Sequence, residues 1–118
     1  MAAYIIGFPQ EWAAERGVLR PYEEQNEALM APYGGRYRVL GSQRVEVLEG
    51  EWKPPLGVIM LEFPTIEQAR AYYDSPEYVP LRALRQAHTR SDVLLVEGQG
   101  ESETLLSRLR ARERRQTS

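Results

Sequence analysis

The order of strand-like and helix-like segments predicts an α+β protein with a ferredoxin-like βαββαβ core. Four short apolar segments rich in β-forming residues lie at 4–8, 36–40, 58–63 and 91–96. One amphipathic stretch separates the first segment from the second, and another separates the third from the fourth. In a ferredoxin-like arrangement the four strands form one antiparallel sheet, and both helices cover the same face of it.

Proline and glycine residues mark where the predicted strands and helices of the first half of the chain begin and end. Pro9 is predicted to end the first strand, and residues 10–18 to form a loop or a short turn. Pro21 fits the first turn of a helix that runs to about residue 31, because a proline inside a helix costs about 3 kcal/mol. The pair Gly34-Gly35 then ends this helix before the second strand.

The segment after the second strand alternates in the same way as a strand. Following a predicted turn at 41–43, residues 44–48 again alternate between polar and apolar side chains. They are expected to form a hairpin with 36–40, or to continue it as one bulged and bent strand.

Capping residues mark the helices of the second half. Thr65, with Gln68 three residues later, has the pattern of a capping box directly after the strand 58–63. Ser75 followed by Pro76 is typical of the cap and first position of a further helix. That helix leads into the last predicted strand.

Apolar residues occupy both faces of the predicted strands. Tyr4, Ile6 and Phe8 alternate with Ile5, and the strand 58–63 is apolar except for Glu62. Because two helices cover only one face of a sheet, the other apolar face needs a partner. The sequence therefore predicts a homodimer that packs two such faces together.

The C-terminal residues 101–118 differ from the body. Residues 1–100 carry a net charge of −4, whereas 101–118 carry +2 and a thin stripe of leucines. We expect one domain over 1–100 and a helical or partly disordered basic tail over 101–118. The tail is expected to dock on the body or on the other subunit. The alternative is a basic arm for an acidic partner.

Composition excludes several functional classes. The chain has no cysteine, which excludes disulfides, thiolate metal sites and a cysteine nucleophile. An acidic body argues against nucleic-acid binding, which needs a concentrated basic face. No apolar run approaches the roughly 18 residues of a membrane helix, and the N-terminus lacks the features of a signal peptide. We expect a cytoplasmic protein that binds neither nucleic acid nor membranes.

Five short motifs in a fixed order carry a family resemblance. They are Tyr33-Gly34-Gly35-Arg36, Leu48-Glu49-Gly50-Glu51-Trp52, Leu61-Glu62-Phe63-Pro64, Asp74-Ser75-Pro76-Glu77-Tyr78 and Val96-Glu97-Gly98. Over roughly residues 18–98 the chain resembles the family called domain of unknown function 1330. The resemblance implies the dimeric α/β-barrel superfamily, in which two ferredoxin-like subunits pack sheet to sheet. Its members include cofactor-free monooxygenases, haem-degrading enzymes and lactone isomerases, so the resemblance implies a pocket rather than a reaction.

Glu62 is the first candidate for chemistry. It lies in the most apolar strand, so its carboxylate must be paired or have its pKa raised. With a raised pKa it would act as a general acid or base. The alternative is an ion pair with Arg36, Arg38 or Arg90, or a strand-end residue that reaches water. Arg36, which follows two glycines, is a candidate anchor for a ligand carboxylate, the alternative being a pair with Glu62 or Glu49.

Five further residues are candidates. Tyr72, Tyr78 and Arg82 would suit an anionic or carbonyl-bearing ligand, although a core tyrosine with a hydrated hydroxyl is the alternative. Trp52 would cover a pocket or pack at the dimer interface. His88, the only histidine, would be a proton shuttle, a packed helical residue or, as the resemblance implies, a haem ligand. No residue spacing indicates a metal site, and no cofactor is predicted.

The residues together predict a small-molecule-binding protein with one pocket per subunit, between sheet and helices near the strand of Glu62. As an enzyme it would carry out cofactor-independent proton transfer, isomerisation or oxygenation of a small polar or carbonyl compound. Glu62 would be the base, with Arg36 or Arg82 as the anchor. The alternative is a non-catalytic binding or regulatory module that uses the same pocket. RNA binding is disfavoured because the strand 57–63 offers neither exposed aromatics nor a basic face.

Overall fold

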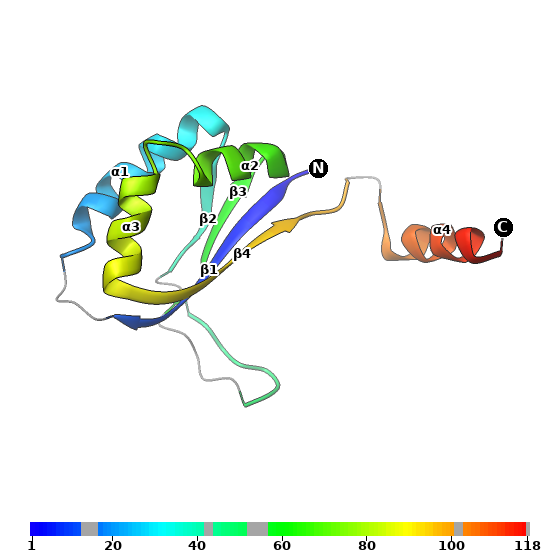
Figure 1. The fold of residues 1–118 in the computed structure, drawn as a ribbon. Coiled ribbons are helices and arrows are strands. Elements are labelled where there is room, and N and C mark those ends of the chain that lie inside the picture. Colours follow the sequence, from blue (N-terminus) through cyan, green and yellow to red (C-terminus); the bar gives the residue numbers. More distant parts are fainter. Residues whose placement is uncertain (13–16, 42–43, 52–56, 101–102, 118) are drawn as a thin grey trace.

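The computed structural model describes residues 1–12, 17–41, 44–51, 57–100 and 103–117, and its body is one antiparallel sheet with helices on one face (Figure 1). The elements are β1 (Ala3–Trp12), α1 (Arg20–Met30), the 3-10 turn η1 (Ala31–Tyr33), β2 (Arg36–Leu40), β3 (Ile59–Phe63), α2 (Ile66–Tyr73), α3 (Val79–His88), β4 (Thr89–Glu97) and α4 (Leu105–Thr117). The strand order is β2-β3-β1-β4, with every neighbouring pair antiparallel. The predicted ferredoxin-like α+β fold is confirmed.

β1 is longer than the sequence predicts. It continues through Pro9 to Trp12, which corrects both the predicted strand end and the first part of the loop expected at 10–18. Pro9 lies opposite Ser91 of β4, and the register shifts just after it. β3 pairs with β1 only as far as Gly7, so proline's missing N–H interrupts no hydrogen bond to β3.

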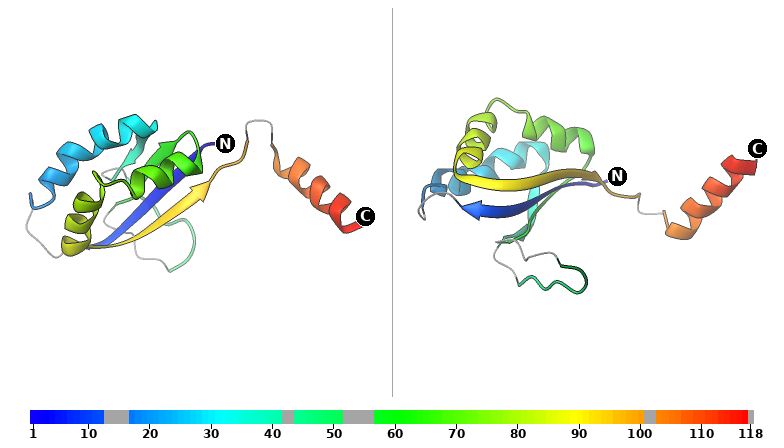
Figure 2. Two further views of the ribbon diagram at one scale, coloured as in Figure 1. Left: turned by 45° about the horizontal axis from the view of Figure 1, so that its top comes forward. Right: turned by 60° about the horizontal axis from the view of Figure 1, so that its bottom comes forward.

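Residues 44–48 do not form the predicted strand. The segment 44–51 projects from the sheet on the side opposite the helices (Figure 2). Alternation stabilises a strand only where a neighbouring strand pairs with it, and β2 pairs with β3 instead. Leu48 on this segment is 90% exposed. The predicted turn residues 42 and 43 lie outside the described residues.

The core lies between the sheet and the three helices that cover it, α1, α2 and α3 (Figure 1). Burial of each large apolar side chain in this layer contributes about 1.5–3 kcal/mol to folding. The buried members are Ala3, Ile5, Met30, Leu61, Phe63, Ala69, Tyr72, Tyr78 and Leu81.

The caps of the second half are partly as predicted. The Thr65 hydroxyl accepts a hydrogen bond from the backbone N–H of Gln68 at 3.1 Å, which confirms this cap. Ser75 accepts from the backbone N–H of Tyr78, but α3 begins only at Val79, later than predicted. Ser75 therefore caps a turn that precedes the helix, and this turn brings Tyr78 into the core.

The sheet face opposite the helices is open in the single chain and carries exposed apolar side chains on β4, and we call it the open face. Leu94 and Val96 of β4 are 51% and 41% exposed on it. The strand register places these two residues beside Ile6 and Tyr4 of β1. The open face is the surface that the predicted homodimer would cover.

The C-terminal helix α4 is present, but it stands apart from the body (Figures 1 and 2). Leu105, Leu106 and Leu109 are exposed. The expected docking of this helix on its own body is therefore wrong in the single chain, because its apolar stripe ends at Leu109 and arginines follow. Docking on another subunit and the basic-arm alternative stay predictions. None of the described helices is long and apolar enough to cross a membrane.

Gly35 provides a test of how tightly the glycine motif packs. A Cβ at this position would lie 2.4 Å from Cε1 of Phe63, inside the core. Because the ring must shift to make room, we expect Gly35→Ala to lower the free energy of unfolding by about 1–3 kcal/mol, measured by urea denaturation. Gly100→Ala is the matched control, since its Cβ would meet no atom nearer than 3.7 Å. Equal stability of the two variants would contradict the prediction.

Candidate functional site

A cavity of about 360 Å³ lies between α1, the C-terminal part of α3 and the sheet, and we call it the helix–sheet cavity. Its volume is in the range of small-molecule sites in proteins. A second hollow of about 50 Å³ shares Tyr22, Ile59 and Arg85 with it and extends toward Tyr72 and Tyr78. The lining of the helix–sheet cavity is Pro9, Leu19, Tyr22, Glu23, Glu27, Tyr37, Leu40, Gly41, Ile59, Arg85, Thr89 and Ser91.

A buried hydrogen-bond network joins three elements behind this cavity. Asn26, one helical turn after Tyr22 on α1, is 1% exposed. Its Nδ2 donates to the Tyr37 hydroxyl at 2.7 Å, and its Oδ1 accepts from the hydroxyl of Tyr72. The network therefore fixes α1 against β2 and α2, and with them the walls of the cavity.

Two further phenols meet beside the network. The hydroxyls of Tyr22 and Tyr78 lie 2.7 Å apart, and either can donate. Burial, followed by the influence of Tyr78, raises the pKa of Tyr22 far above the ordinary value, and burial does the same for the pKa of Tyr72. Burial also raises the pKa of Tyr37. Tyr22, Tyr37 and Tyr72 therefore stay neutral at physiological pH and act as hydrogen-bond donors or acceptors rather than as bases.

Arg82, a predicted anchor, lies outside this cavity. Its guanidinium stacks over the ring of Tyr73 at 4.6 Å from the centroid and donates to the Tyr73 carbonyl at 3.0 Å. It also lies 3.6 Å from the carboxylate of Asp74. These contacts hold the end of α2 against α3. The cavity's guanidinium comes instead from Arg85, one turn further along α3.

Glu62 lies on the open face, across the sheet from the helix–sheet cavity. Arg36 and Arg38 donate to its Oε2 at 2.9 and 2.8 Å, and the Tyr4 hydroxyl donates to Oε1 at 3.4 Å. The hydrogen bond from Arg36 is the main cause of a lowered pKa, with Arg38 in support and burial working against it. These contacts correspond to the alternative prediction for both Glu62 and Arg36, in which the two residues form an ion pair. The pKa is therefore lowered, not raised as general acid–base chemistry would require.

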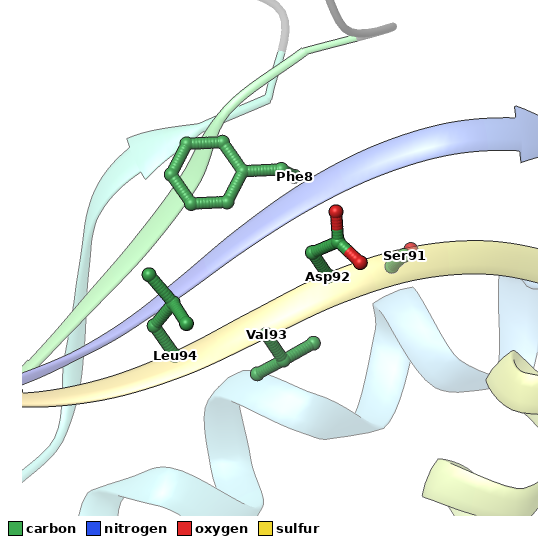
Figure 3. Close-up of a pocket in the computed structure, with 5 residues that line it drawn as sticks. All are labelled: Phe8, Ser91, Asp92, Val93 and Leu94. Carbon is green, nitrogen blue, oxygen red and sulfur yellow. The ribbon is translucent and has the colours of Figure 1, made fainter.

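Larger depressions also lie outside the helix–sheet cavity. One, of about 410 Å³, borders Arg36 and Glu62. The other, of about 670 Å³, is an open hollow beside Phe8 of β1 and Asp92 and Leu94 of β4 (Figure 3). The second belongs to the open face and offers few polar groups that could orient a ligand.

The remaining candidates divide between the core and other parts of the chain. Tyr72 and Tyr78 are buried in the core and border the smaller hollow. His88 is the last residue of α3 and is half-buried, but it does not line the helix–sheet cavity. Trp52 lies outside the described residues.

Sequence reasoning missed the polar residues of the site, among them Tyr22, Asn26, Tyr37 and Arg85. Tyr22 and Asn26 share one helical face, and this spacing was the available signal for α1. Arg85 follows the buried Leu81 by four residues on α3, so the same spacing places its stem toward the core. Tyr37 carried no comparable signal, because its partners come from distant elements.

Comparison with known proteins identifies a family. The family model described as "Domain of unknown function (DUF1330)" matches residues 2–99, most of the chain. This match confirms the resemblance carried by the five motifs. None of the curated proteins matches the chain.

Solved structures share the fold at low identity. A protein of unknown function from Rhodopseudomonas palustris is 16% identical with a TM-score of 0.64, covering 84% of this chain and 83% of its own. A dimeric protein of unknown function with a ferredoxin-like fold from Bacteroides fragilis is 16% identical with a TM-score of 0.54, covering 82% and 95%. A single-site variant of SnoaB, a cofactor-independent oxygenase from Streptomyces nogalater, is 13% identical with a TM-score of 0.54, covering 86% and 97%. At these identities the likeness shows the fold alone.

The ion pairs of Glu62 give a pH-dependent test. Because Arg36 and Arg38 lower the pKa of Glu62, its stabilising contribution is present above the ordinary value of 4.5 and is lost as the pH falls through the folded-state pKa. We expect Glu62→Gln to lower the melting temperature at pH 7, and the gap from the unmodified protein to close as the pH falls below 4.5.

Glu77→Gln is the matched control for this series, because Glu77 is exposed. Melting temperatures recorded from pH 7 downward by circular dichroism would check both variants. A gap for Glu62→Gln that does not change with pH would contradict the ion-pair account.

Proposed function

The chain belongs to the DUF1330 family of unknown function, and we propose that it binds a small molecule in the helix–sheet cavity. The observation that carries the proposal is the cavity itself, which combines apolar walls with a few convergent polar groups. Leu19, Leu40 and Ile59 supply apolar contact area. Tyr22 and Arg85 supply directional hydrogen bonds that would orient a ligand.

We further propose that the protein acts as a homodimer through the open face. Its exposed apolar residues support this, because contiguous apolar surface on a soluble domain marks an interaction site. The Bacteroides fragilis neighbour, which is described as dimeric, has the same fold. A twofold pair would cover the same surface on both copies.

Cofactor-independent oxygenation is the reaction class that we propose to test first. The support is the fold shared with SnoaB, which is described as a cofactor-independent oxygenase, together with neutral phenols and a guanidinium that would stabilise an anionic oxygen on a ligand. Non-catalytic binding is the second candidate. It is favoured by the low basicity of the paired Glu62, the residue predicted to serve as the base.

Leu40 and Leu48 form a matched pair for testing the cavity. Leu40 lines the helix–sheet cavity and is 62% exposed, whereas Leu48 lies on the projecting segment 44–51, does not line the cavity and is 90% exposed. We expect native mass spectrometry with a panel of small aromatic compounds to show one ligand per chain. Leu40→Trp should abolish this binding by filling the cavity, and Leu48→Trp should retain it. Oxygen uptake on adding the bound compound would identify an oxygenase, and retention without turnover would identify a binding module.

The same assay separates the two possible ligand locations. If Leu40→Trp retained the ligand and Glu62→Gln lost it, the site would lie at the depression beside Arg36 and Glu62. That outcome would overturn the proposal for the helix–sheet cavity.

Leu94 tests the homodimer. Replacing this exposed apolar side chain with arginine would bury a charge in the paired sheet faces, which costs several kcal/mol. We expect light scattering to give a dimer mass for the unmodified protein and a monomer mass for Leu94→Arg. Val79→Asp on the helical layer is the control and should stay dimeric, since Val79 lies at the start of α3, away from the open face. A monomeric unmodified protein would contradict the proposal.

A further inference from the structure

Arg85 is the one arginine that lines both the helix–sheet cavity and the smaller hollow, among the residues that the structure describes. It lies on α3 near the helix C-terminus and is half-buried. A charged side chain in such a position is retained at a cost unless something compensates its charge.

The charge of Arg85 has no carboxylate partner in the described part of the chain. By contrast, Arg36 and Arg38 both bind Glu62, and Arg82 faces Asp74. Burial works to lower the pKa of Arg85, but the phenols of Tyr78 and Tyr22 outweigh it and the pKa is raised. The guanidinium therefore stays charged, beside the hydroxyls of Tyr22 and Tyr78.

The two phenols leave hydrogen-bonding capacity for a ligand. The bond between the hydroxyls of Tyr22 and Tyr78 uses only one of their two protons. With Tyr78 as the donor in this pair, the proton of Tyr22, which lines the helix–sheet cavity, is left to donate beside the guanidinium of Arg85. Donors from both sources suit a carboxylate, which accepts several hydrogen bonds at once.

We propose that the helix–sheet cavity takes a small aromatic or otherwise apolar monocarboxylic acid, whose carboxylate binds Arg85 and whose apolar part lies against Leu19, Leu40 and Ile59. This inference rests on the proposed function, and it names the ligand class of the same site. Glu23 and Glu27 are exposed residues of α1 that also line the cavity. Their charges disfavour a second negative charge on the ligand, which selects a monoacid over a diacid.

Three probes of similar shape separate the effect of the ligand's charge on affinity from the effect of its shape. They are a naphthoate, the corresponding naphthyl methanol as its neutral counterpart, and a naphthalene dicarboxylate. By titration calorimetry we expect the naphthoate to bind about tenfold or more tightly than the alcohol, the order expected for a charge-assisted hydrogen bond. The dicarboxylate should bind more weakly than the naphthoate.

Variants assign that preference to Arg85. Arg85→Gln should remove the preference for the acid over the alcohol, and Arg85→Lys should keep part of it. Arg70→Gln, an exposed arginine of α2, is the control and should leave all three affinities unchanged. If Arg85→Gln fails to fold, the comparison of the acid with the alcohol on the unmodified protein still tests whether the cavity prefers a carboxylate.

Two failures are distinguishable. Equal binding of acid and alcohol, unchanged in Arg85→Gln, would overturn the acid assignment and leave the cavity as a binding site. Absence of binding by all three probes would overturn the cavity function and the acid assignment together.

Discussion

The buried amide of Asn26 is the contact on which the rest of this arrangement depends. One side chain satisfies the hydroxyls of both Tyr37 and Tyr72, which come from a strand and a helix distant in the chain. Losing such a partner inside a core costs about 1–3 kcal/mol for each group left unpaired. Among the described residues, no buried side-chain polar atom lacks a hydrogen-bond partner. The amide therefore sets the distance between α1 and the sheet, and this distance leaves room for the cavity.

The sheet separates two kinds of polar chemistry. On the helix side, phenols, one guanidinium and the carboxylates of Glu23 and Glu27 line the helix–sheet cavity. On the open face, a carboxylate is held by two guanidiniums. The first arrangement leaves donors for a ligand, whereas the second uses most of its donors internally. The residue types alone do not distinguish these situations, because arginine, tyrosine and glutamate occur in both.

The sequence predicted the fold well, because the fold depends on local patterns: apolar alternation, the positions of Pro21 and Gly34-Gly35, and the cap at Thr65. The errors have local causes of a different kind. Residues 44–48 alternate between polar and apolar side chains but have no strand beside them. β1 continues through Pro9 because β3, its neighbour on one side, has already ended. A register shift between Tyr37 and Val39 places Leu40 opposite Ile59, on the cavity side. Simple alternation would have assigned Leu40 to the open face with Arg36. The candidate site was harder to predict because it joins α1, α3 and residues of all four strands, and no sequence spacing encodes those contacts.

The extension of β1 beyond Gly7 has a mechanical consequence. There the sheet narrows to a ribbon of two strands, β1 and β4, and Pro9, Thr89 and Ser91 of this ribbon line the cavity. A ribbon held by one ladder of hydrogen bonds, with an irregular register, opens at a lower free energy than the four-stranded part. This two-stranded ribbon is thus the most compliant wall of the cavity. A ligand could enter and leave by brief fraying of this corner, while the Asn26 network and the core keep their geometry.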